Sequence, residues 1–130
     1  MTFLSSLSNC TFLEELVIFD NSFNTSIPDY IGNLPISLNT FLASFNQIKG
    51  QIPMGIVSLK NLIFLDLSSN NLTGNIPSTL GGLEGLQRLH LRVNNIGGNI
   101  PEELCQLRNL GQLLLSHNKI SLETSIFCRD

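Results

Sequence analysis

A repeat with a period of about 24 residues constrains this chain more than any other feature. The stretch NNLTGNIPSTLGGL at 70–83 is preceded by NQIKGQIPMGIVSL at 46–59 and followed by NNIGGNIPEELCQL at 94–107. One asparagine marks each unit, and the first step is one residue longer than the others: Asn21, Asn46, Asn70, Asn94 and Asn118. A period of this length indicates a solenoid, in which each unit packs against its neighbours.

An apolar frame with the spacing LxxLxL precedes each of these asparagines. In the third unit the frame is Leu62, Leu65 and Leu67. The alternation in LxL is typical of a short strand that buries one face. A single strand of this kind cannot bury that face alone. The repetition therefore predicts parallel strands that are stacked over one continuous apolar core.

The second half of each unit predicts a turn and a short return segment. Gly50, Gly74 and Gly98 suit a turn that other residues would strain, and the Ile-Pro pair that follows favours extended backbone. The asparagine side chains are expected to bond backbone groups and form a ladder between units. The predicted fold is an α/β right-handed solenoid, with a parallel β-sheet on the concave face and extended and short-helical segments on the convex face.

The repeat pattern predicts one domain over residues 1–130. Its units are expected at about 1–12 (partial), 13–37, 38–61, 62–85, 86–109 and 110–130 (degenerate). The extra residue of the longer first step falls in GNLPISL, between Pro28 and Leu38, and is interpreted as a bulge on a loop. Because the repeat pattern fails after Ser121, residues 122–130 are expected to be loosely packed.

Composition and side-chain chemistry argue against several classes of function. The net charge is −3 without a basic tract, so nucleic acid is not an expected partner. No apolar run approaches the ~18 residues of a membrane span, and the first residues do not resemble a signal peptide. The two histidines, His90 and His117, form no recognisable catalytic set, so we expect no enzymatic activity and no cofactor.

The three cysteines are not clustered as metal ligands would be, so no metal site is expected. Cys10 precedes the first frame where other units have leucine, and is expected in the core. Cys105 is expected on the convex flank. Structural cysteines are expected, and a disulfide between Cys105 and Cys128 is the alternative.

The pattern LxxLxLxxNxLxGxIPxxLxxL, from about Leu4 to Ile120, resembles the plant-type extracellular leucine-rich repeat. The stretches SSLSNCTFLEEL, GNLPISLNTF and EELCQLRNL resemble ectodomains of plant leucine-rich-repeat receptor-like kinases, particularly the subfamily with microbial-pattern receptors. This resemblance implies a module at the extracellular face of the plasma membrane that binds a ligand or co-receptor. A membrane span and a serine/threonine kinase domain would follow in the parent protein.

The chain departs from a complete receptor of this kind. It has no paired-cysteine caps and no kinase motifs. We therefore expect a fragment of an ectodomain, non-catalytic, that binds a peptide or protein ligand and possibly a co-receptor in immune or developmental signalling. The alternatives are a secreted leucine-rich-repeat inhibitor of cell-wall-degrading enzymes and a receptor-like protein without a kinase.

The strand positions between the buried leucines predict the binding surface, because they face the concave side. Aromatic and arginine side chains are frequent interface anchors. The predicted partner-binding residues are Phe19, Phe45, Phe64, Asp66, Arg88, His90 and Arg92. Three sequons give possible N-glycosylation at Asn9, Asn24 and Asn71, although a repeat rich in asparagine and serine also generates sequons by chance.

Overall fold

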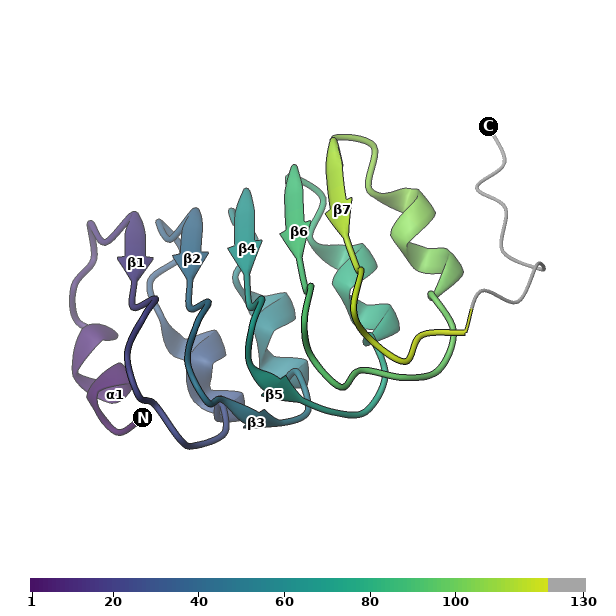
Figure 1. The fold of residues 1–130 in the computed structure, drawn as a ribbon. Helices are drawn as coiled ribbons and strands as arrows, with labels where there is room; N and C mark the ends of the chain where they lie inside the picture. The colour runs from purple at the N-terminus through teal and green to yellow at the C-terminus, as the bar shows by residue number, and fades with distance from the viewer. Residues whose placement is uncertain (122–130) are drawn as a thin grey trace.

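A parallel sheet of five short strands forms one face of the protein (Figure 1). The computed structural model describes residues 1–121, so the expectation for residues 122–130 lies outside the described range. The strands stand in the order in which they occur along the chain: β1 (Glu15–Val17), β2 (Thr40–Leu42), β4 (Phe64–Asp66), β6 (Arg88–His90) and β7 (Gln112–Leu114). A second parallel sheet pairs β3 (Lys49–Gly50) with β5 (Asn71–Leu72).

Short helices cover the opposite side of the arc (Figure 1). The first, α1 (Phe3–Leu7), is α-helical. The others are 3-10 helices: η1 (Asp29–Asn33), η2 (Met54–Ser58), η3 (Ser78–Gly82) and η4 (Glu102–Gln106). A proline with extended backbone stands before each 3-10 helix, as at Pro53 with φ −72° and ψ 145°. The structure therefore confirms the predicted fold, in which a parallel sheet alternates with extended and short-helical return segments.

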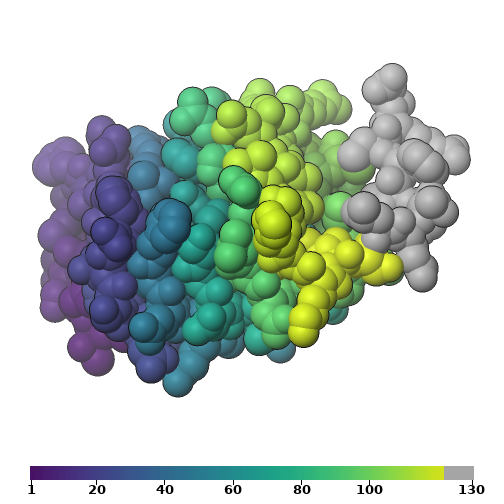
Figure 2. Space-filling model, in the orientation of Figure 1, coloured from purple at the N-terminus to yellow at the C-terminus, as the bar shows by residue number. Residues whose placement is uncertain are grey.

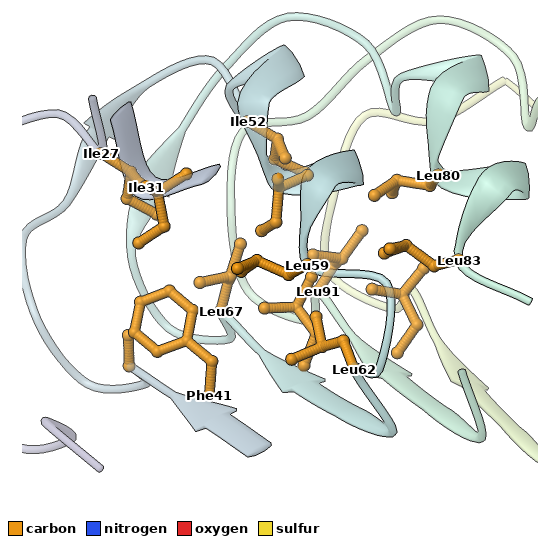
Figure 3. Close-up of a cluster of buried hydrophobic side chains, with 14 of the residues drawn as sticks. Ile27, Ile31, Phe41, Ile52, Leu59, Leu62, Leu67, Leu80, Leu83 and Leu91 are labelled. Atoms are coloured by element: carbon orange, nitrogen blue, oxygen red, sulfur yellow. The ribbon is translucent and has the colours of Figure 1, made fainter. Parts of the chain in front are cut away.

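The apolar core lies between the sheet and the short helices (Figure 3). Leu65 of β4 pairs in register with Leu89 of β6, and both side chains are fully buried. Figure 3 shows side chains such as those of Leu59, Leu62 and Leu83 between the strands and the short helices. Each buried leucine contributes about 1.5–3 kcal/mol relative to an exposed one. Leu113 of β7 is only partly buried, so the core is most completely buried in the middle units of residues 1–121.

The repeat asparagines join each unit to the one before it. The Oδ1 atom of Asn70 accepts a hydrogen bond from the backbone N–H of Ile48 at 3.0 Å. Its Nδ2 atom donates to the carbonyl oxygens of Ala43 and Leu67, each at 3.0 Å. Asn46, Asn94 and Asn118 make bonds of the same kind. Backbone groups that the strand end leaves unpaired are thereby satisfied inside the stack.

The extra residue of the longer first step lies between η1 and β2. The N–H of Leu34 caps η1 by bonding to Ile31, and the N–H of Leu38 then donates to the carbonyl oxygen of Pro35 at 3.0 Å. The strands on either side keep their register, with Glu15 opposite Thr40. The addition is therefore a local bulge on a loop, as the sequence predicts.

A row of residues with left-handed backbone precedes the asparagines, and the sequence pattern does not predict it. These residues, with φ from 53° to 60°, are Asp20, Phe45, Ser69, Val93 and His117. They turn the chain three residues after each strand of the five-stranded sheet ends. A β-branched residue is rare in this region because its Cβ substituents crowd the backbone. Val93 therefore carries conformational strain.

We expect replacement of Val93 by asparagine to stabilise the protein. Asparagine tolerates left-handed backbone, and Val93 is 45% exposed, so little burial is lost. The expected gain in the free energy of unfolding is about 0.5–1 kcal/mol. Chemical denaturation measures it. Val17 is the matched control, because it is 46% exposed but lies in the strand β1. Val17→Asn is expected to lower the stability of the protein, since asparagine is disfavoured in strands. A loss of stability in Val93→Asn would contradict the strain.

The prediction that Cys10 lies in the core is wrong. Its carbonyl oxygen accepts the N–H of Leu13, as that of Leu59 accepts the N–H of Leu62, but the thiol is exposed. Cys10 lies at the edge of the stack, where no other described unit covers it. Cys105, in η4, is disulfide-bonded, whereas the proposed partner Cys128 lies outside the described residues.

Candidate binding face

The sheet aligns the side chains between the buried leucines into columns on the concave face. The pairing registers place one column at Glu15, Thr40, Phe64, Arg88 and Gln112. The next column holds Val17, Leu42, Asp66, His90 and Leu114. Figure 2 shows the successive units as neighbouring bands of surface, without any intervening segment over the described part. Residues that are one repeat apart in the sequence therefore form one continuous surface.

A hollow of about 530 Å³ lies on the β1, β2 and β4 side of this face. Its lining combines apolar side chains with two carboxylates and one serine: Phe19, Asp20, Leu42, Ser44, Phe45, Phe64 and Asp66. Phe45 is 62% exposed and Phe19 is 50% exposed, so two phenyl rings stand open to solvent. The left-handed turn at Phe45 places its side chain beyond the strand, where no described neighbour covers it.

Phe64 is half-buried and is not the open aromatic that the sequence predicts. The guanidinium carbon of Arg88 lies over its ring, 5.3 Å from the centroid. The ring of His90 meets Phe64 edge-on, with the centroids 4.9 Å apart. Both partners come from β6, the next strand in the sheet, and they cover part of the Phe64 ring. The three side chains form one cluster beside the hollow.

Several polar side chains of the face are held by hydrogen bonds. The Nε2 atom of His90 lies 3.0 Å from Oε1 of Gln112, and Nε of Arg92 donates to Oγ of Ser116 at 2.8 Å. The Oδ1 atom of Asp66 accepts the backbone N–H of Ser68 at 2.9 Å. These bonds hold the side chains in defined orientations.

The structure thus separates the predicted binding residues into two neighbouring groups. Phe19, Phe45, Phe64 and Asp66 line the hollow, whereas Arg88, His90 and Arg92 lie beside it on and after β6. The lining residues Asp20, Leu42 and Ser44 are not among the predicted binding residues. The strand alternation places Ser44 on the open face, but it is only 6% exposed. The position of Leu42 in a column of the sheet is enough to predict that it lies on the face. No sequence signal predicts the left-handed backbone of Asp20.

The charges of the face are divided along the row of strands. Glu15 and Asp20 lie at the β1 end, and Arg88 and Arg92 lie near the other end. Strands spaced ~4.8 Å apart put the first and fourth about 14 Å apart, since three spacings separate them. This exceeds the Debye length of about 8 Å at physiological ionic strength, so the two ends act as separate charge patches.

The three predicted sequons lie away from this hollow. Asn9, Asn24 and Asn71 are all exposed, and Asn71 belongs to β5 in the second sheet. Within residues 1–121, no three histidine, cysteine or acidic side chains gather as metal ligands would. The same part of the chain contains no helix with the length and apolar character needed to cross a membrane.

Comparison with protein families matches the leucine rich repeat over residues 60–120 and again over residues 12–34. A search of curated proteins gave no match. Several solved structures match strongly. The plant peptide hormone receptor RGFR1, in complex with RGF2, is 41% identical with a TM-score of 0.83, over 88% of this chain and 18% of the receptor chain.

Two Arabidopsis receptors give similar matches. The ectodomain of the membrane receptor kinase GASSHO1/SCHENGEN3 from Arabidopsis thaliana, in complex with CASPARIAN STRIP INTEGRITY FACTOR 2, is 41% identical with a TM-score of 0.82, over 87% of this chain and 13% of that one. The receptor kinase HAESA, in complex with the peptide hormone IDA and the co-receptor SERK1, is 36% identical with a TM-score of 0.81, over 87% and 19%. This chain thus spans less than a fifth of each receptor. It is a leucine-rich-repeat protein that matches the ectodomains of plant leucine-rich-repeat receptor kinases over most of its own length.

Proposed function

We propose that this chain is a ligand-binding part of a plant receptor kinase ectodomain, displayed at the extracellular face of the plasma membrane. Its partner is a peptide or protein ligand that lies across the concave face. One observation carries the proposal: an aromatic hollow lies directly beside a basic strand on an open face of the sheet. The peptide-bound receptors that resemble it support the same class of partner.

The two groups of residues divide the work of recognition. Phe45 and the open part of Phe64 pack against the apolar part of a partner side chain, because aromatic rings in a hollow exclude water efficiently. Arg88 and Arg92 hold a carboxylate of the partner by charge-assisted hydrogen bonds. An extended peptide of about five residues spans the ~14 Å between the first and fourth strands. The chain itself performs no chemistry in this proposal.

A co-receptor is the second partner in the proposal. The comparison structures include a BIR3–SERK2 complex, 33% identical to this chain with a TM-score of 0.77 over 82% of it. The HAESA complex also holds a co-receptor. A kinase domain on the parent protein would pass the signal to the cell interior.

Selection from a displayed library of random peptides tests the function. We expect the full chain to select peptides that lose about tenfold or more in affinity for Phe64→Ala, because Phe64 is central to the face. Arg88→Ala and Arg92→Ala are expected to weaken peptides that carry a carboxylate. Isothermal titration with the selected peptides measures these affinities.

Met54→Ala is the matched control, because Met54 is exposed on η2, among the return segments. It is expected to leave the affinity unchanged. Unchanged affinity in all three concave-face variants, with the amide spectrum of the fold intact, would overturn the proposed function.

A further inference from the structure

We propose that the hollow binds a basic side chain of the partner, an arginine or a lysine, between its phenyl rings and its two carboxylates. The inference rests on the proposed function and names the chemistry that one part of the face recognises. The lining of the hollow holds Asp20 and Asp66 but no cationic residue. The hollow therefore carries negative charge in a wall that is otherwise mainly apolar.

Neither carboxylate is neutralised by the described part of the chain. Within residues 1–121, Asp20 and Asp66 form no ion pair. Oδ1 of Asp66 accepts one backbone N–H, from Ser68, which fixes the orientation of the group and leaves its second oxygen for a partner. A cation that enters the hollow would meet a carboxylate that is already oriented, so less ordering accompanies binding.

The protein itself shows that a ring of this hollow accommodates a guanidinium. Arg88 lies over Phe64 at 5.3 Å from the centroid, which is within the range of a cation–π contact. Arg88 is not among the residues that line the hollow, so it leaves the β1 and β2 side of Phe64 open. Phe19 and Phe45 offer two further rings there, and both are exposed.

The alternative occupants fit the lining less well. A purely apolar side chain would remove water from two carboxylates without supplying a partner, and unpaired charges are costly to desolvate. An acidic side chain would be repelled. Arginine and lysine fit both parts of the wall, because their aliphatic stems pack against rings while their cationic heads reach carboxylates.

A matched pair of small probes tests the inference directly: acetyl-arginine amide and its neutral isostere acetyl-citrulline amide. Each is titrated into the full chain while backbone amide signals are followed by NMR. We expect the arginine probe to shift the signals of Phe45 and Asp66 and to bind about fivefold or more tightly than the citrulline probe. High salt should reduce this preference.

Variants of the two carboxylates complete the test. In Asp20→Asn/Asp66→Asn the preference for the arginine probe should disappear. Asp29→Asn, an exposed position in η1, should retain it. Equal binding of the two probes, or a preference that survives in the double variant, would overturn the inference. Those outcomes leave the proposed function standing, since that function fails only if the concave-face variants bind the selected peptides unchanged.

Discussion

Replacing Asn70 by alanine is expected to lower the free energy of unfolding by about 2–4 kcal/mol, because it leaves buried backbone groups without partners. Asn70 is 7% exposed, and its Oδ1 atom is the acceptor for the N–H of Ile48 in the preceding unit. Alanine cannot accept that bond, and water cannot reach the group in the stack. Urea denaturation, followed by circular dichroism, measures the loss.

Asn21→Ala is the matched control for this effect. Asn21 occupies the same place in the first unit, but its side chain is exposed. Among residues 1–121 it donates only to Ile18 and Phe19 of its own unit. Its removal is expected to cost less than about 1 kcal/mol. If the two variants lost equal stability, the bonds between units would not be the source of the effect.

Replacing Gly55 by alanine is expected to destabilise the protein by about 3 kcal/mol or more, because the added methyl overlaps backbone. A Cβ atom at Gly55 would overlap the carbonyl oxygen of Asp29 and lie 2.9 Å from its carbonyl carbon. Gly55 lies in η2 and Asp29 in η1, so the clash would force these neighbouring helices apart. Thermal unfolding by calorimetry measures the shift in Tm.

Gly85→Ala provides the comparison, since an added Cβ there has the carbonyl oxygen of Leu62, 3.9 Å away, as its nearest neighbour. Its stability is expected to change by less than about 0.5 kcal/mol. If Gly55→Ala fails to fold while Gly85→Ala folds normally, the steric explanation holds. A Gly55→Ala protein as stable as Gly85→Ala would refute it.

The fold could be predicted from the sequence because a stack repeats one environment. Once Leu65 is identified as a buried strand residue, the period gives the same position to Leu89, and the structure pairs them. The hydrogen-bonding capacity of asparagine and the conformational freedom of glycine are properties of the residues themselves. They apply in each unit without knowledge of the surroundings.

The details of the candidate site could not be predicted in the same way. Phe45 and Val93 have left-handed backbone, although neither residue type favours it. The period-two alternation predicts that Phe64 lies on the open face, but its cover comes from Arg88, which belongs to the next repeat. Whether a side chain is covered in this way depends on the rotamers of the side chains in neighbouring units. Cys10 likewise follows the pattern but lacks a covering neighbour among the described residues.

The bulge between η1 and β2 shows where the length of the chain can vary in such a protein. Residues 35–37 take up one additional residue, yet β1 and β2 stay paired. From strand to proline the described units keep one length, because a left-handed turn and an asparagine each hold a fixed place. In three of these units a glycine with positive φ also holds a fixed place: Gly50, Gly74 and Gly98. Insertions and deletions should therefore be tolerated at the joint that leads into a strand and rejected just after it. A surface loop for a label or an epitope has a natural location there, next to Ile36, which is exposed.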